Sequence, residues 1–310
     1  MNAIVEFPLL ASSDLLKQAD IEFDRETATL YWWMRPSPRP CFNPAFLEES
    51  KVFEGRIEQH QGWFLHDGQE CRIENAVYGS AIPGVFNLGG DLSMFVQAIL
   101  RKDRSTLTYY GRLCVDNMYR RMTGYNAQIM TYTLLQGRAF GGGFECALAS
   151  ECIIAEKSAT VSLPEVLFNM FPGMGALSLL ARRIGLRKAE DVIMSGRVYT
   201  AREMYDMGVV DELAEDGAGL ETARLMIKSR QRRKNAYRAM SDAKREVMPV
   251  DHAEMRAVVD VWVDAALKLE TRDLRMMARL ARAQDRLVST TREETVLDNL
   301  YEPMEEAANA

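Results

Sequence analysis

Residues 137–175 read GRAFGGGFECALASECIIAEKSATVSLPEVLFNMFPGMG, and this stretch decides the fold. Three consecutive glycines, Gly141 to Gly143, are followed by a carboxylate at Glu145 and a second one at Glu165. An earlier segment, FNLGGDL over residues 86–92, supplies another glycine-rich turn. Glycine lets a backbone N–H approach a ligand closely. Two such amides on one oxygen form an oxyanion hole, and two nearby acids can move protons. The sequence therefore predicts an enzyme that acts beside a carbonyl group.

The pattern around this stretch is that of an α/β fold. Residues 128–135 (QIMTYTLL) are apolar and β-prone, which is typical of a buried strand. The glycines come next, then a short helix predicted over residues 144–150 and a strand over residues 152–155. Strand, glycine turn, helix and strand in this order indicate a largely parallel, wound sheet. Residues 219–287 are almost wholly helical in character.

The remaining elements follow from periodicity and capping residues. Strands are predicted over residues 21–34 (one or two), 71–81 and 209–210. Helices are predicted over residues 43–60, 91–100, 105–122, 176–183, 188–194 and 201–207. In the first of these helices one side is expected to be buried, with Phe46, Leu47, Val52, Phe53 and Ile57 on it.

Composition excludes several classes of protein. The 310 residues are 47% hydrophobic and 26% charged, as in an ordinary globular protein, and the net charge of −6 gives no reason to expect nucleic-acid binding. The five cysteines are scattered without a CxxC pair, and the three histidines lack paired spacing, so neither a disulfide frame nor a metal site is expected. No signal peptide and no run of 18 apolar residues are found, so no membrane span and a cytoplasmic location are expected.

Several motifs carry a family resemblance. FNLGGDL, GGGFE and LPEVLFNMFPGMG resemble the two oxyanion loops and the two glutamates of the crotonase (enoyl-CoA hydratase/isomerase) superfamily. More narrowly, GVFNLGGDL, LPEVLFNMFPGMGA, LARRIG and YWWMRP resemble the bacterial diffusible-signal-factor synthases, which make cis-2-unsaturated fatty-acid signals. The resemblance covers roughly residues 21–287.

This resemblance implies a crotonase-like α/β spiral of ββα units, with a C-terminal helical layer that builds a trimer. The implied division is an N-terminal extension over residues 1–20, a spiral core over 21–235, a helical region over 236–290 and an acidic tail over 291–310.

The resemblance also assigns the site residues. The two oxyanion donors fall on the backbone N–H groups of Gly90 and Gly142, and Gly142 stands beside the start of the helix that carries Glu145. Glu165 follows Pro164, which is expected to give it an extended, rigid approach. Both acids have apolar neighbours, so their pKa values are expected to rise and to separate. Each feature taken alone also has a non-catalytic explanation. The glycines could form a plain tight turn, the Glu145 carboxylate could serve only to interact with the helix dipole, and Glu165 could lie on a surface loop.

The expected reaction removes water from a 3-hydroxyacyl thioester to give a 2-enoyl thioester, which is then hydrolysed to the free acid. Spacing does not say which glutamate is the acid and which is the base, although Glu145 is taken as the principal group for elimination. The acyl chain is expected against Trp262, Leu280, Met174 and Met276, each of which could instead be plain core. Two alternatives stay open, a plain enoyl-CoA hydratase/isomerase of fatty-acid metabolism and an idle scaffold that binds a regulator.

No cofactor is expected, and the partners follow from the substrate. The acyl group is carried by acyl carrier protein or CoA, a regulatory sensor protein can bind, and the chain forms a homotrimer or hexamer. A basic run between Lys228 and Arg245 is either a solvated helix face or a docking patch for an acidic carrier protein, with Arg182 and Arg183 as a weaker candidate.

Overall fold

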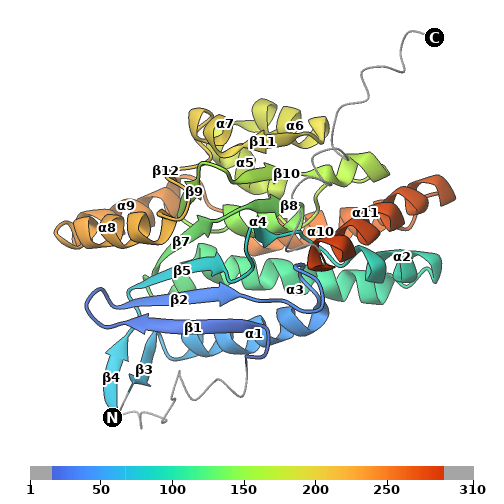
Figure 1. Ribbon diagram of the computed structural model, residues 1–310. Helices are drawn as coiled ribbons and strands as arrows, with labels where there is room; N and C mark the ends of the chain where they lie inside the picture. Colours follow the sequence, from blue (N-terminus) through green and yellow to red (C-terminus); the bar gives the residue numbers. More distant parts are fainter. Residues whose placement is uncertain (1–15, 67, 290–310) are drawn as a thin grey trace.

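Two sheets form the frame of the molecule (Figure 1). The structure is a computed structural model that describes residues 16–66 and 68–289. The larger sheet has the strand order β1-β2-β5-β7-β9-β12 and is parallel except for its first pair. The smaller sheet has the order β11-β10-β8-β6 and is parallel except between β10 and β11, and β3 and β4 form a separate hairpin. The strands are Ala19–Asp24 (β1), Thr29–Met34 (β2), Trp63–His66 (β3), Gln69–Arg72 (β4), Asn75–Ser80 (β5), Val85–Asn87 (β6), Met130–Leu135 (β7), Arg138–Phe140 (β8), Cys152–Glu156 (β9), Thr160–Ser162 (β10), Val198–Thr200 (β11) and Glu212–Ala214 (β12).

The chain winds through these sheets as a spiral of ββα units. The strands β5, β7 and β9 enter the larger sheet, the strands that follow them, β6, β8 and β10, enter the smaller one, and helical segments come next. Because β6 and β8 are parallel neighbours, the loops that follow them leave the sheet at the same edge. The crotonase-like α/β fold expected from the sequence is therefore confirmed.

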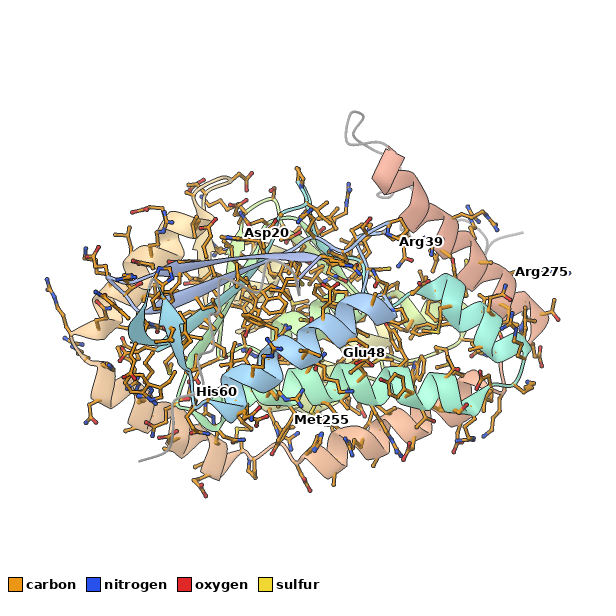
Figure 2. The ribbon with its side chains drawn as sticks, turned by 90° about the horizontal axis from the view of Figure 1, so that it is seen from below. Asp20, Arg39, Glu48, His60, Met255 and Arg275 are labelled. Carbon is orange, nitrogen blue, oxygen red and sulfur yellow. The ribbon has the colours of Figure 1, made fainter. Side chains whose placement is uncertain are left out.

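Helices cover both sheets and close one end of the molecule. Seen from below, α1, which carries Glu48 and ends just before His60, lies beside α3, and α10 with Met255 lies on the other side of α3 (Figure 2). The helix α11 packs on α2 and on the short segment η3. The helices are Pro44–Gln59 (α1), Leu92–Leu100 (α2), Arg104–Met122 (α3), Gly142–Leu148 (α4), Ala176–Ile184 (α5), Leu186–Ser195 (α6), Ala201–Asp206 (α7), Gly219–Gln231 (α8), Lys234–Val247 (α9), His252–Ala266 (α10) and Thr271–Ser289 (α11), with 3-10 turns at Gly124–Asn126 (η2) and Pro164–Phe168 (η3).

Capping residues explain where the predicted helices begin. The Asn43 side chain accepts a hydrogen bond from the backbone of Phe46, and the Asp91 side chain accepts one from Met94, as expected at helix N-termini. Four of the five residues expected on the buried side of α1 are indeed buried, namely Phe46, Leu47, Phe53 and Ile57. Val52 is an exception, because 46% of its surface is exposed.

Two strand predictions and the expected conformation at Glu165 need correction. The strand predicted over residues 71–81 is interrupted between β4 and β5, and the first part belongs to the separate hairpin. Val209 and Val210 are buried but lie before the strand, which is β12. Glu165 is not extended, since Pro164 starts the 3-10 turn η3, where its fixed φ and missing N–H fit a first helical position.

Other expectations concern the ends and the surface of the chain. Within residues 16–66 and 68–289, no helix is both long enough and apolar enough to cross a membrane. In the same residues no group of His, Cys, Asp and Glu side chains could hold a metal ion. All five cysteines are free thiols. The expected acidic tail and residues 1–15 of the expected N-terminal extension lie outside the described residues.

Candidate active site

The two glycine turns meet at the edge of the smaller sheet, one after β6 and one after β8. A Cβ atom on Gly142 would lie 3.6 Å from the amide nitrogen of Gly90, and a Cβ on Gly89 would lie 2.8 Å from the nitrogen of Gly142. Only residues without side chains allow the two turns to come this close. The structure gives neither the Gly90 nor the Gly142 amide a hydrogen-bond acceptor among the described residues. Both residues line one cavity.

The first turn is held in place by the side chain of Asn87. Asn87 is fully buried, and its Oδ1 accepts a hydrogen bond of 2.8 Å from the Gly89 amide. Gly89 has a φ of +85°, a backbone conformation that favours glycine. The loop that carries the Gly90 amide is therefore fixed before any ligand binds.

Glu145 lies in the first turn of α4 and is buried, with 1% of its surface exposed. Its Oε1 accepts two backbone hydrogen bonds, from Met174 at 2.9 Å and from Ala176 at 3.0 Å. Burial raises the pKa of Glu145 to about 7, and the two amide donors work in the opposite direction by stabilising the carboxylate. One oxygen is thus anchored, which leaves Oε2 for a ligand.

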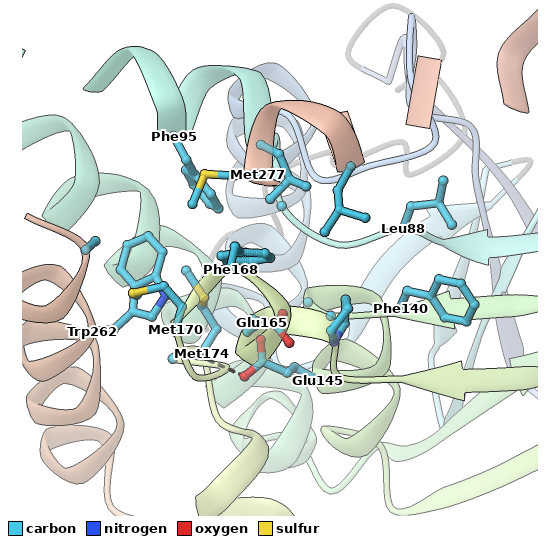
Figure 3. Close-up of a pocket in the computed structure, with 18 of the residues that line it drawn as sticks. Leu88, Phe95, Phe140, Glu145, Glu165, Phe168, Met170, Met174, Trp262 and Met277 are labelled. Atoms are coloured by element: carbon cyan, nitrogen blue, oxygen red, sulfur yellow. Dashed lines mark hydrogen bonds between the residues drawn. The ribbon is translucent and has the colours of Figure 1, made fainter. Parts of the chain in front are cut away.

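Glu165 lies in η3 and faces the same cavity, so the two acids come together as expected (Figure 3). Its Oε2 is buried and has no hydrogen-bond partner among the described residues. Burial raises the pKa of Glu165 to about 8, and the charge of Glu145 adds to the rise. Because Glu165 lacks the two amide donors that Glu145 has, Glu165 holds its proton more strongly. The expectation that the pKa values of both acids rise and separate agrees with this geometry.

Apolar side chains form the rest of the cavity wall. The predicted residues Trp262, Leu280 and Met174 all line it, from α10, α11 and the turn before α5. Met276 does not; it is 37% exposed, and its neighbour Met277 faces the cavity instead. Further wall residues that the sequence did not single out are Leu88, Phe95, Ile99, Tyr110, Phe140, Phe168, Met170 and Gln284.

The cavity is narrow in this structure. Its volume is about 70 Å³, well below the ~300–1,000 Å³ of typical ligand pockets. The rings of Phe95 and Trp262 meet edge to face, with centroids 5.2 Å apart, and Met277 lies beside Phe95 (Figure 3). Aromatic and thioether side chains therefore fill the space at this end.

A buried ion pair supports α4 from behind. Arg121 and Glu54 are 3% and 0% exposed, and Arg121 Nε donates to Glu54 Oε1 at 2.9 Å. Arg121 Nη1 also donates to the Sγ of Cys146, the residue after Glu145, at 2.8 Å. This contact joins α1 and α3 to the helix that carries the carboxylate. The sequence offered no sign of it, because the three residues are far apart in the chain.

The basic run is largely neutralised within the fold. Five of its side chains reach carboxylates of the same chain. Arg230 stacks over two tyrosine rings. Arg182 and Arg183 likewise pair with Glu254 and Asp211. Most of these charges are therefore committed, which favours the alternative of a helix face over a docking patch.

Comparison with known proteins adds a family match. Residues 68–293 match the family model described as enoyl-CoA hydratase/isomerase. The chain is 28% identical over 192 residues to mouse mitochondrial methylglutaconyl-CoA hydratase, covering 60% of this chain and 52% of the relative. It is 30% identical over 161 residues to a probable mitochondrial enoyl-CoA hydratase 2 of Arabidopsis thaliana, covering 51% and 50%.

Solved structures show the same fold. An enoyl-CoA hydratase from Bacillus halodurans superimposes with a TM-score of 0.69 at 19% identity, covering 85% of this chain and all (100%) of the other. The matched segments span only about a fifth to a half of the length of the curated relatives.

Proposed function

Because the chain belongs to the enoyl-CoA hydratase/isomerase family, we propose that it moves water on and off the C2–C3 bond of an acyl thioester. The observation that carries this proposal is the cavity itself. Two glycine amides, an amide-anchored carboxylate and a second carboxyl group with a higher pKa share its wall. Such a set can hold a thioester oxygen and move two protons beside it.

The thioester oxygen accepts hydrogen bonds from the Gly90 and Gly142 amides. As negative charge develops on this oxygen, each donor stabilises the transition state by about 3–4 kcal/mol. In the direction of hydration, the Glu145 carboxylate removes a proton from water, whose oxygen then bonds to C3. Protonated Glu165 gives its proton to C2, so the substrate gains one water and the two acids exchange charge states.

Dehydration runs through the same groups in reverse. The Glu165 carboxylate takes a proton from C2, and protonated Glu145 gives one to the departing C3 hydroxyl. The two amides on Oε1 of Glu145 support this division of roles, because they leave its other oxygen for the hydroxyl or water. The dry wall of the cavity keeps the intermediate from other water.

More specifically, we propose that the chain is a diffusible-signal-factor synthase, which releases a free cis-2-enoic acid. After dehydration, a carboxylate of the pair activates a second water, which attacks the thioester carbonyl carbon; the carbon–sulfur bond breaks and the thiol leaves with a proton. Support comes from the sequence motifs of the two loops and from the apolar wall at Trp262 and Leu280. The alternative is a hydratase/isomerase of fatty-acid metabolism, which keeps the thioester intact.

Mass spectrometry separates these two outcomes. Purified protein is given 3-hydroxyacyl thioesters of CoA and of acyl carrier protein, and enoyl thioester, free thiol and free acid are measured. Free cis-2-enoic acid with equal thiol release supports the synthase, and enoyl thioester alone supports the hydratase. Glu145→Gln and Glu165→Gln should each lower the rate at least ~100-fold. Near-normal rates in either variant would contradict the mechanism.

We also propose that copies of the chain assemble through α9, as a homotrimer or hexamer. The face of α9 toward the rest of the chain is polar: Lys234 and Arg238 reach Glu74, and Ser241 and Arg245 reach Glu151. The residue two positions after each of these side chains lies on the opposite face of α9. That face carries an apolar stripe of exposed residues, Ala236, Met240, Ala243 and Val247. An amphipathic helix normally buries its apolar face. The reversed orientation supports a second copy as its cover.

A further inference from the structure

Gln284 is a polar residue of the cavity wall that the proposed reaction does not use. It lies on α11, is 7% exposed and lines the cavity next to the first glycine turn. Its Nε2 donates to the carbonyl oxygen of Leu88 at 3.0 Å and to that of Gly90 at 3.3 Å. Both neighbours of Nε2 are acceptors, so this atom must be the NH₂ group, and the orientation of the amide is fixed.

The other atom of this amide has no partner. Oε1 of Gln284 is buried and accepts no hydrogen bond from any described residue. A buried acceptor without a donor costs free energy, so an exception of this kind calls for an explanation. Since Gln284 is part of the wall, a ligand in the cavity is the natural source of the missing donor.

The position of Gln284 along α11 indicates which part of a ligand lies near it. Met277, on the same helix, lies beside Phe95 at the aromatic end of the cavity (Figure 3). Seven residues of helix separate Met277 from Gln284, a rise of about 10 Å. Gln284 touches the carbonyl of Gly90, whose own amide is the proposed thioester donor. It therefore lies at the thioester end, away from the acyl chain.

We infer that Gln284 Oε1 accepts a hydrogen bond from the carrier arm of the acyl thioester, at its first amide N–H beyond the sulfur. This inference rests on the proposed function. On the acyl side of the thioester carbonyl, the hydrogen-bond donor is the C3 hydroxyl, and the two glutamates already bind it. On the thiol side, two methylenes lead from the sulfur to an amide N–H that CoA and acyl carrier protein both possess. Gln284 thus makes the site selective for thioesters with this amide.

The test compares two ligands that differ in one group. Octanoyl-N-acetylcysteamine contains the amide, and the octanoyl thioester of 4-oxopentanethiol has a methylene in place of its N–H. Both are saturated, so neither can undergo hydration, and binding is measured by stopped-flow quenching of tryptophan fluorescence. The wild-type protein should bind the amide ligand about tenfold more tightly, the usual cost of leaving a buried acceptor without a donor. In Gln284→Met this preference should fall to about one.

A purely structural role predicts a different result. If Gln284 only holds α11 against the first glycine turn, Gln284→Met lowers the affinity for both ligands by the same factor. The preference for the amide ligand then persists, which would overturn the inference. No preference in the wild-type protein, or no binding of either ligand, would overturn it as well. Met277→Leu, at the aromatic end of the cavity, is the matched control and should change both affinities alike.

Failure of the proposed function gives a separate signature. If enoyl and hydroxyacyl thioesters are not converted but the amide preference is present and lost in Gln284→Met, the reaction is wrong and the contact stands. Octanoyl-CoA and octanoyl-acyl carrier protein should both bind Gln284→Met more weakly by a similar factor. The wild-type preference between these two then identifies the carrier.

Discussion

At the scale of single residues, the two glutamates differ in what surrounds their oxygens. Two backbone amides hold Glu145 Oε1, whereas Glu165 Oε2 is buried without a described partner. The amides stabilise the charged form of Glu145, whereas Glu165, which is buried without such donors, keeps its proton to higher pH. Two like groups thereby acquire different charge states at neutral pH.

This difference predicts a bell-shaped pH profile for hydration. The rate needs Glu145 ionised, so kcat/KM should rise as pH increases through about 7, the raised pKa of Glu145. It also needs Glu165 protonated, so kcat/KM should fall as pH increases through about 8, the raised pKa of Glu165. Initial rates with a 2-enoyl thioester from pH 5 to 10 measure this. A rate that keeps rising above pH 9 would contradict the assignment of Glu165 as the acid.

Replacing Glu165 by Gln should stabilise the protein at high pH only. Because its pKa is raised on folding to about 8, the proton on Glu165 contributes stability that is complete below the unfolded pKa and is lost as pH rises through the folded one. Gln cannot ionise, so the variant avoids this loss. With an unfolded pKa of about 4.3 and a folded pKa of about 8, the gain at pH 9 should be on the order of 3–5 kcal/mol, and below ~0.5 kcal/mol at pH 4. Calorimetric melting at both pH values measures it; an equal gain at both would indicate packing instead of charge.

At the scale of elements, the turn of residues 171–175 connects the cavity wall to Glu145. Its Met174 amide and the Ala176 amide that follows hold the Glu145 carboxylate, while the Trp262 ring of α10 packs directly on Gly173. A Cβ atom on Gly173 would overlap that ring. The packing of α10 and the position of the carboxylate are thus joined through one glycine.

Gly173→Ala should therefore reduce both stability and activity. Either the ring or the turn must move, at a cost of roughly 1–3 kcal/mol, and a moved turn displaces the two amides from Glu145. Melting temperature and kcat measure the two effects. Gly55→Ala on α1 is the control, because nothing lies within 4 Å of a Cβ there and alanine favours helix by up to ~1 kcal/mol. Unchanged melting and kcat in Gly173→Ala would show that Trp262 does not rest on this turn.

Some elements of this fold could be predicted from the sequence and others could not. Helices with a capping side chain, such as Asn43 before α1 and Asp91 before α2, could be predicted because the cap and the period agree. The strands β6, β8 and β10 could not, since three residues are too few to show alternation. These short strands bring the two glycine turns together.

Some residues of the site could likewise be predicted from the sequence, and others could not. Gly90, Gly142, Glu145 and Glu165 stand in motifs, so their residue types and order made them visible in the sequence. The choice between Met276 and Met277 depends on how α11 rotates against α2, and one residue turns a helical side chain by about 100°. Gln284 carried no signal, because a single glutamine on a helix gains meaning only from the carbonyl groups it meets.

At the scale of the whole molecule, the C-terminal helices are used in two different ways. The helices α10 and α11 cover the chain's own cavity, with Trp262 and Leu280 in its wall. The helices α8 and α9 lie on another side of the molecule, away from α2 and α11 (Figure 1). The implied trimer layer is therefore best sought in α9.

Assembly through α9 makes a prediction about mass in solution. Met240 is 61% and Val247 is 79% exposed in the single chain, and both lie on the apolar stripe. Placing a charge at each position would require desolvating two carboxylates in an apolar contact, which costs far more than the contact contributes. Met240→Asp with Val247→Asp should therefore shift the protein from trimer or hexamer to monomer in light scattering after size exclusion.

The control tests whether the position of the charge matters. Val52 on α1 is also exposed, at 46%, but lies outside α9, so Val52→Asp should leave the assembly unchanged. Dissociation by Val52→Asp as well would indicate a general effect of added charge. A wild-type chain that stays monomeric at all concentrations, or an α9 variant that keeps the wild-type mass, would show that the stripe is not covered by a second copy. The reversed helix would then require a different occupant.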